Sequence, residues 1–340
     1  MKKRLKVVLL TGLIFLLILG SLALYLFKTP ALSIENTQYF KVNEGDDPTI
    51  LAQRLERECN MKYSKLFLFL ADRMNLKRWM KKGRYTIEPD MTYPELIRLF
   101  REGKMKTVDL VIAPGISLEN FANRCGSKLE ADTLDFYTIL QDTAFLDSFG
   151  FNPQTVYALI LPDKYNLYWH TQADEMIQSM YKEYVKFWNA ERLQKLQRLG
   201  LDAIEVSILA SIVSKETNKV DEMSDVAGMY INRLRLNMPL QADPTVKFAL
   251  DSPGLKRILF GHLQVESPYN TYKNKGLPPG PICIPGKKAI DAVLDFKEHN
   301  YIYMCAKEDF SGYHNFSATY EEHLKYAAKY RKALDERNIH

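Results

Sequence analysis

The chain has 340 residues, a formal net charge of +5 and a charged fraction of 26%. That length is enough for two or more domains of ordinary size. No basic block interleaved with aromatic residues occurs, so the sequence indicates no nucleic-acid partner. The six histidines show no metal-ligand spacing, and no glycine-rich phosphate loop is present. We therefore expect neither a metal nor a nucleotide cofactor.

The N-terminal segment has the composition of a membrane anchor. Residues 7–27 contain no charged side chain, and at roughly 1.5 Å per residue such a helix spans a hydrocarbon core of about 30 Å. Four of the residues 1–6 are basic, and only Lys28 follows closely. The positive-inside rule then predicts a cytoplasmic tail at 1–6 and a body outside the cell membrane. A cleaved signal peptide is the alternative, although no small-residue cleavage site is evident.

A linker at residues 28–38 leads to a predicted small α+β module at 39–104. The patterns predict strands at 39–42 and 83–87, with helices at 49–55, 63–80 and 93–100 between and after them. The strand-helix-helix-strand order resembles a LysM-like module, a type that binds N-acetylglucosamine-containing glycans. A small α+β spacer without a sugar site fits the same order.

Residues 105–200 form a second strand-helix unit and a helical connector. A strand is predicted at 108–112, followed by a helix capped by Ser117. Further along, residues 158–165 are predicted to form a strand closed by a Pro-Asp turn. An amphipathic helix is expected at 181–199, where Gly200 ends it.

The chemistry is predicted in residues 201–340. Residues 203–213 are apolar on nearly every face, which indicates a buried helix. Glu216 lies at its C-terminal end, where desolvation and the helix dipole both raise the pKa of a carboxylate. A carboxylic acid that stays protonated near neutral pH can act as a general acid. The alternative is a surface glutamate paired with Lys215 or Lys219.

Several features surround this helix. A second helix carries the apolar stripe of 226–234, and Asp243 is predicted to cap a short helix that begins at Pro244. The irregular loop 267–282, rich in tyrosine, asparagine and proline, suits sugar binding. A strand pair at 301–306 and 312–316 precedes a helix capped by Thr319. His314, on the second strand, is either a hydrogen-bonded partner or an acid-base residue.

The four cysteines lie far apart in the sequence. Their spacing fits no zinc or redox motif, so they are predicted to be core residues, with at most one disulfide. They are Cys59, Cys125, Cys283 and Cys305.

Six ordered motifs together resemble the YceG-like family of endolytic murein transglycosylases. They are ILASIVSKET at 208–217, VAGMYINRL at 226–234, MPLQADPTV at 238–246, SPYNTY at 267–272, GLPPGPI at 276–282 and GYHNF at 312–316. The resemblance covers the chain from the anchor to about residue 330. It implies an α+β protein with an N-terminal transmembrane helix, a small LysM-like α+β subdomain and a larger mixed α+β catalytic domain at 201–340.

The resemblance also implies an activity. Members of the family cleave the β-1,4 bond between N-acetylmuramic acid and N-acetylglucosamine in peptidoglycan strands and leave 1,6-anhydro ends. By this match Glu216 is the single catalytic acid, and no cofactor or metal is required. The implied partners are peptidoglycan, the membrane and proteins of cell-wall synthesis. The residues that would line or shape the groove are Asn232, Gln241, Asp243, Thr245, Tyr269, Asn270, Tyr272 and Asn315.

Two departures from the family pattern stand out. Ser214 occupies the first position of a motif that often carries two glutamates, so the catalytic role falls on Glu216. Upstream, Ala158, Leu159 and Lys164 replace residues that many relatives share, which leaves the role of that stretch open.

Two other functions remain possible from the sequence. One is a membrane-tethered glycan-binding or scaffold protein without catalysis. The other is a glycoside hydrolase that uses Asp243 as a second carboxylate.

Overall fold

The computed structural model describes residues 10, 13–14, 17, 20–21, 24–25, 27–252, 255 and 258–337. It divides into two compact units. The first unit contains the described residues through Val108 together with Asn166–His170. The second contains Asp109–Tyr165 and the described residues from Thr171 onward. Both units combine helices with two-stranded sheets, so the α+β prediction is confirmed.

The predicted membrane anchor at residues 7–27 falls largely outside the described residues. Within the part of the chain that the structure describes, no helix combines the length and the apolar character that crossing a bilayer would require.

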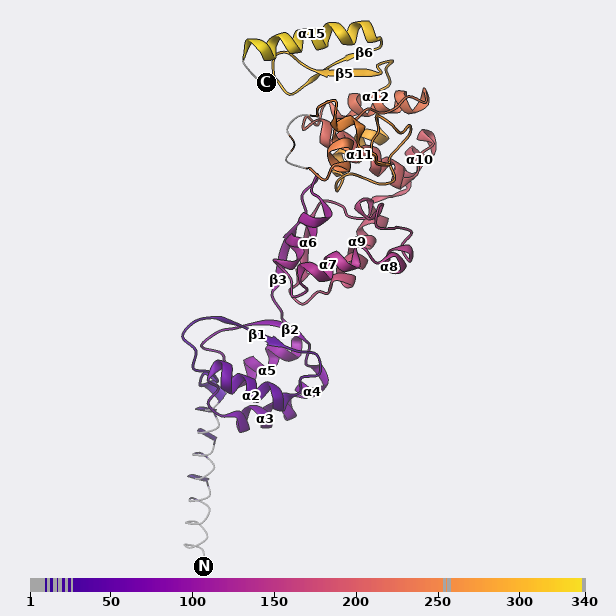
Figure 1. The fold of residues 1–340 in the computed structure, drawn as a ribbon. Helices are drawn as coiled ribbons and strands as arrows, with labels where there is room; N and C mark the ends of the chain where they lie inside the picture. Colours follow the sequence, from indigo (N-terminus) through magenta and orange to yellow (C-terminus); the bar gives the residue numbers. More distant parts are fainter. Residues whose placement is uncertain are drawn as a thin grey trace, which may run out of the picture. The chain divides into compact units, whose positions relative to one another are not determined.

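In the first unit, helices cover one side of an antiparallel pair of strands (Figure 1). Strand β1 pairs with β2 in antiparallel register, with Phe40 opposite Tyr85. Because side chains alternate along a strand, Phe40 and Tyr85 point together into the core that the helices cover. The elements are β1 (Gln38–Val42), α2 (Pro48–Cys59), α3 (Ser64–Arg73), α4 (Leu76–Trp79), β2 (Gly83–Ile87) and α5 (Tyr93–Glu102).

The prediction of a single helix at 63–80 is wrong. The structure contains two helices, α3 and α4, separated at Met74 and Asn75. Asn75 has a left-handed backbone with φ of 53°, a conformation that asparagine adopts more readily than most residues. Apolar periodicity continues across the break because both helices face the same core.

A distant segment completes the first unit. The guanidinium carbon of Arg84 lies 5.0 Å from the centre of the Trp169 ring and 3.6 Å from that of Tyr39. Cation–π contacts of this kind are attractive within about 6 Å. This contact connects Trp169 of the segment 166–170 to the first unit, and nothing in the local sequence signals it.

The chain from Thr107 to Leu199, most of which belongs to the second unit, is mainly helical. Strand β3 pairs with β4, and the Ser117 side chain accepts a hydrogen bond from the backbone N–H of Asn120, as predicted for a cap. The elements are β3 (Thr107–Val111), α6 (Leu118–Gly126), α7 (Thr133–Ile139), α8 (Thr143–Asp147), the 3₁₀ turn η1 (Val156–Ala158), β4 (Lys164–Tyr168), α9 (Ala173–Phe187) and α10 (Ala190–Leu199).

Two predictions in this region are wrong. The strand expected at 158–165 is instead a 3₁₀ turn followed by buried irregular chain, and β4 begins only at Lys164. A short apolar run is compatible with any buried conformation, so periodicity cannot decide its type. The helix expected at 181–199 is interrupted at Asn189, whose side chain caps α10 by accepting from Arg192 N–H.

The helices that carry the predicted chemistry form the core of the second unit. Helix α11 (Ala203–Glu216) is buried along most of its length, as predicted from its apolar sequence. It packs against α12 (Met223–Arg235) and α14 (Lys287–Leu294). The short α13 (Asp243–Ala249) and the 3₁₀ turn η2 (His262–Gln264) precede the irregular segment 267–282.

The C-terminal part adds a hairpin and a long helix. Strands β5 (Tyr303–Ala306) and β6 (His314–Ser317) pair antiparallel, as predicted. Helix α15 (Tyr320–Glu336) lies along this hairpin (Figure 1). Thr319 caps α15 by accepting a hydrogen bond from the N–H of Glu322. The hairpin and α15 form one wall of the pocket described next.

All four cysteines are free thiols. Cys59, Cys125 and Cys283 are buried, and Cys305 is partly buried. Burial raises the pKa of the Cys283 thiol to about 12, so this group stays protonated and behaves as a small apolar side chain.

Candidate active site

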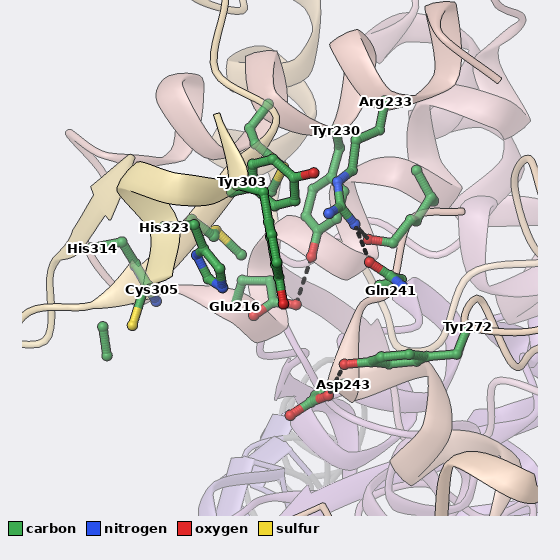
Figure 2. A pocket seen from close by; sticks show the side chains of 15 residues that line it. Glu216, Tyr230, Arg233, Gln241, Asp243, Tyr272, Tyr303, Cys305, His314 and His323 are labelled. Carbon is green, nitrogen blue, oxygen red and sulfur yellow. Dashed lines mark hydrogen bonds between the residues drawn. The ribbon is translucent and has the colours of Figure 1, made fainter. Parts of the chain in front are cut away.

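A pocket of about 320 Å³ lies between the α11–α13 core and the C-terminal hairpin with α15 (Figure 2). Its volume falls in the range of small-ligand sites, roughly 300–1,000 Å³. Four polar residues predicted from the sequence meet here, namely Glu216, Gln241, Asp243 and Tyr272. The other lining residues are Met229, Tyr230, Arg233, Leu240, Tyr303, Met304, Cys305, Ala306, His314, Tyr320 and His323.

Glu216 is the last residue of α11 and lies partly buried in this pocket. The hydroxyl of Tyr230 donates a hydrogen bond to Oε1 of Glu216 over 2.7 Å. Burial raises the pKa of the Glu216 carboxyl from 4.5 to about 7, and the charge of Asp243 adds to the rise. The Tyr230 hydrogen bond and the nearby His314 and Lys247 act in the opposite direction. The result is a carboxylic acid that can both give and take a proton near neutral pH.

Arg233 binds the turn at residues 239–241, which forms part of the pocket wall. Its side chain is only 6% exposed. Nη1 donates to the carbonyls of Pro239 and Leu240 and to Oε1 of Gln241, at 3.1, 2.6 and 3.1 Å. Nε donates to the carbonyl of Ile302 over 2.7 Å, at the start of the hairpin. One guanidinium therefore ties two walls of the pocket together.

Gln241 sits at the turn that Arg233 fixes. Its backbone adopts a φ of 54°, a left-handed conformation that costs free energy in any residue other than glycine. The Gln241 N–H donates to the carbonyl of Thr271 over 3.0 Å, and its side chain accepts from Arg233. The surroundings thus hold the strained residue, and its side chain lines the pocket.

Asp243 corrects a sequence prediction. Ala242, and not Asp243, is the cap residue of α13, and Asp243 is the first residue inside the helix. Instead of capping, its Oδ1 accepts a hydrogen bond of 2.5 Å from the hydroxyl of Tyr272. The pair lies on the pocket wall below Glu216 in the view of Figure 2. This carboxylate therefore serves the pocket and not the helix terminus.

Two more predicted residues, Thr245 and Asn270, support the pocket without lining it. Thr245 is fully buried; its hydroxyl donates to the carbonyl of Ala242 and lies 2.8 Å from the Thr271 hydroxyl. Asn270 is also fully buried and donates from Nδ2 to the carbonyls of Leu263 and Val265. These bonds shape the loop that presents Tyr272.

The remaining predicted residues lie farther away. Asn232 donates to the carbonyls of His299 and Tyr301 and so holds the chain before β5. Tyr269 packs its ring against Phe248, with centroids 4.7 Å apart. Asn315 donates to Glu308 within the hairpin region.

His314 lines the pocket and is anchored from behind. Its Nδ1 lies 3.0 Å from Oε2 of Glu222, and its backbone N–H donates to Oε1 of the same carboxylate over 2.6 Å. Glu222 is only 5% exposed. The interpretation of His314 as a hydrogen-bonded partner is confirmed. Its side chain also lines the pocket, and an acid-base role stays a prediction.

The residues at the two departures from the family pattern do not line the pocket. The Ser214 hydroxyl faces the N–H of Gly286 at 3.5 Å, and Lys215 donates to the carbonyl of Gly115 over 2.7 Å. Lys164 forms an ion pair with Asp109 over 2.8 Å. Glu216 is thus the member of its motif that reaches the pocket.

Sequence reasoning missed several lining residues. Tyr230 lies in the predicted apolar stripe of 226–234, a pattern that accounts for its buried ring but not for its hydroxyl. Arg233 lies in the motif at 226–234, but the sequence analysis gives it no role in the site. Tyr303 and His323 come from the hairpin and α15, whose approach to Glu216 depends on tertiary packing. Among the described residues, no cluster of histidine, cysteine or acidic side chains could hold a metal ion.

Comparisons with known proteins agree with the motifs. The model of the YceG-like family matches residues 40–329. The endolytic murein transglycosylase of Bacillus subtilis is 33% identical over 170 residues, which cover 49% of this chain and 45% of that protein. The protein of the same name from Streptococcus pneumoniae is 25% identical over 300 residues, covering 78% and 53%. This chain therefore spans about half the length of the curated relatives it matches.

A solved structure shows the same fold. A crystal structure from Listeria monocytogenes, described as yceG-like, superposes with a TM-score of 0.56 at 28% sequence identity. The match covers 86% of this chain and 99% of that one. The resemblance predicted from the six motifs is confirmed: this chain belongs to the YceG-like family.

Proposed function

We propose that this protein is a peptidoglycan lytic transglycosylase with Glu216 as its catalytic acid. The observation that carries the proposal is the state of this carboxyl, whose pKa burial raises to about 7 while Tyr230 holds one of its oxygens. The named function of the relatives, endolytic murein transglycosylase, supports the same substrate class.

The proposed reaction needs one carboxyl group. Protonated Glu216 gives its proton to the oxygen that links C1 of N-acetylmuramic acid to C4 of N-acetylglucosamine, and the C1–O bond breaks. The C6 hydroxyl of the muramic acid then attacks C1 and passes its proton to the Glu216 carboxylate. The products are a 1,6-anhydro end and a new C4 hydroxyl, without water, and Glu216 is protonated again.

The position of Asp243 favours this reaction over hydrolysis. A hydrolase uses two carboxylates, one of which activates water or attacks the sugar. Oδ1 of Asp243 is already engaged by the Tyr272 hydroxyl at 2.5 Å. Asp243 is then an electrostatic neighbour that raises the pKa of Glu216, and not a second catalytic group.

The setting of the enzyme is part of the proposal. The uncharged residues 7–27, preceded by basic residues, support a single-pass anchor with the body outside the cytoplasm. The strand pair and helices of the first unit support a LysM-like role in glycan contact, and the resemblance adds wall-synthesis proteins as partners. In this setting the enzyme would act on strands close to the membrane.

Digestion of purified peptidoglycan with the full chain in detergent tests the activity. Mass spectrometry should find 1,6-anhydro ends that disappear in Glu216→Gln and persist in the control Ser214→Ala, whose hydroxyl faces Gly286. Reducing ends would point to the hydrolase alternative. Binding of the strands without cleavage would leave the glycan-binding or scaffold alternative.

A further inference from the structure

We infer that His323 contacts the substrate in this pocket, as a neutral imidazole that donates a hydrogen bond from Nε2 to an oxygen of the sugar bound beside Glu216. The inference rests on the proposed function and adds a residue to it. His323 comes from the first turns of α15, far in sequence from the motifs that predict the site.

Aromatic stacking fixes the position of the ring. The His323 imidazole lies 5.3 Å from the Tyr303 ring at an interplanar angle of 26°, and 6.1 Å from the Tyr320 ring at 27°. All three side chains line the pocket, and Figure 2 shows the imidazole pointing toward Glu216. Because Nδ1 is buried and the ring lines the pocket, the edge that carries Nε2 is the one available to the pocket.

The inner nitrogen determines where the proton sits. Nδ1 of His323 is buried, and no described residue forms a hydrogen bond with it. A buried N–H without a partner is rarer in proteins than an under-satisfied acceptor, because an unshared donor proton loses its whole hydrogen bond to water. The favoured tautomer therefore leaves Nδ1 bare and places the proton on Nε2.

The protonation state of the His323 ring gives it a role different from that of Glu216. Burial lowers the pKa of His323, and the neighbouring charge of Arg233 lowers it further. An imidazole in this position resists a second proton, so it is a poor base for the C6 hydroxyl. It can instead hold an oxygen of the sugar through its N–H, which requires no change of charge.

The other histidine of the pocket shows the contrast. His314 faces the Glu222 carboxylate with Nδ1 and is tied to it again through its backbone N–H. Its position is therefore explained by contacts within the protein. Nδ1 of His323 has no such partner among the described residues, and the side chain lines the pocket, where its other nitrogen can form a hydrogen bond.

The test separates activity from stability. His323→Phe keeps a stacked ring and removes both nitrogens. We expect kcat/KM for peptidoglycan cleavage to fall about tenfold, since one hydrogen bond to the bound sugar is lost. The melting temperature should stay equal or rise, because a buried polar atom without a partner has been removed. A purely structural histidine would lower stability and activity together.

A matched control and two further variants sharpen the test. His262→Phe removes a histidine outside the pocket whose Nδ1 accepts from Leu259 N–H, so cleavage should be unchanged. His323→Gln places an amide N–H near the position of Nε2 and should restore part of the activity. His323→Asn, whose amide lies near Nδ1, should not. The pH at which activity is half-maximal should be the same in wild type and His323→Phe.

Each remaining outcome gives a clear answer. If the wild type cleaves peptidoglycan and His323→Phe cleaves it equally well, the inference is overturned and the proposed function stays intact. The same conclusion follows if His323→Asn restores activity and His323→Gln does not. A shifted pH profile would make His323 an acid-base group and would also overturn it. Absence of wild-type cleavage would contradict the proposed function itself.

The sugar oxygen can come from two groups, and the substrate distinguishes them. Both an N-acetyl carbonyl and a ring hydroxyl offer an acceptor to the Nε2 proton. On de-N-acetylated strands the penalty of His323→Phe should vanish if the acceptor is the acetyl carbonyl, and persist if it is a hydroxyl. Either result supports the contact and assigns its partner.

Discussion

The hydroxyl of Tyr230 lies 2.7 Å from Oε1 of Glu216 and donates to it from a side chain that is only 1% exposed. One carboxyl oxygen is thereby held by the core of the protein, and the other is left for the pocket. The same bond opposes the effect of burial on the Glu216 pKa, because it stabilises the charged carboxylate. Tyr230 thus both fixes the position of the Glu216 carboxyl and limits the rise of its pKa.

Removal of the Tyr230 hydroxyl should alter the pH dependence of the cleavage activity. In the proposed reaction Glu216 must be protonated to give its proton to the glycosidic oxygen, so wild-type activity should decline as the pH rises through about 7. Tyr230→Phe deletes the hydrogen bond that lowers the pKa, so the decline should move to higher pH. The maximal kcat should fall about tenfold to a hundredfold, because the carboxyl loses its orientation. Initial rates of anhydro-end formation from pH 5 to 9 measure both effects, and an unmoved profile would contradict the proposed role of Tyr230.

Asp243→Asn should shift the profile in the opposite direction. The charge of Asp243 raises the Glu216 pKa, and asparagine removes this charge while keeping an oxygen that can accept from Tyr272. The decline should therefore begin at lower pH than in wild type. The same rate series measures it. Loss of all activity at every pH, with the fold intact, would instead indicate that Asp243 is a second catalytic carboxylate.

Glu216→Gln should change stability in a pH-dependent way. The folded protein favours the protonated carboxyl, whose pKa is about 7 against 4.5 for the ordinary group. This contribution to stability is fully present below about pH 4.5 and is lost as the pH rises through about 7. Glutamine cannot ionise, so at pH 8 the variant should be more stable than wild type by on the order of 2–3 kcal/mol. Urea denaturation at pH 4.5 and 8 measures the difference, and an equal gain at both values would rule out this cause.

Arg233→Lys should destabilise the protein and loosen the pocket. An ammonium group cannot reproduce the planar fork that binds Leu240, Gln241 and Ile302 at once. We expect a loss of about 3 kcal/mol from the free energy of unfolding, together with a higher KM because Gln241 loses its support. The control is Arg235→Lys on the exposed side of the same helix, which should cost less than about 0.5 kcal/mol. Equal losses in the two variants would refute the bridging role of Arg233.

The success of sequence reasoning followed local patterns. Helix α11 was predictable because its apolar residues cover every face, and Glu216 was notable because it follows directly. The break at Asn75 was not predictable, since the two helices on either side share one core and so keep one periodicity. Likewise, the approach of Arg84 to Trp169 joins residues for which no local signal exists.

The candidate site shows the same division. Gln241, Asp243 and Tyr272 lie in motifs and line the pocket. Asn270 also lies in a motif, but its side-chain amide donates its hydrogen bonds to carbonyls of the loop. A motif identifies residues that matter to a site without saying which of them face the ligand. His323 shows the converse, because its place in the pocket depends on how α15 packs on the hairpin and not on its neighbours in sequence.

The wall that the hairpin and α15 contribute has a consequence for the newly made chain. Glu216 leaves the ribosome long before Tyr320 and His323, and until they arrive one side of its pocket is open to water. Burial is the largest cause of the raised Glu216 pKa, so we expect that pKa to lie closer to the ordinary glutamate value until this wall is in place. The proposed transglycosylase would then acquire its catalytic acid only when helix α15 has been synthesised and has docked.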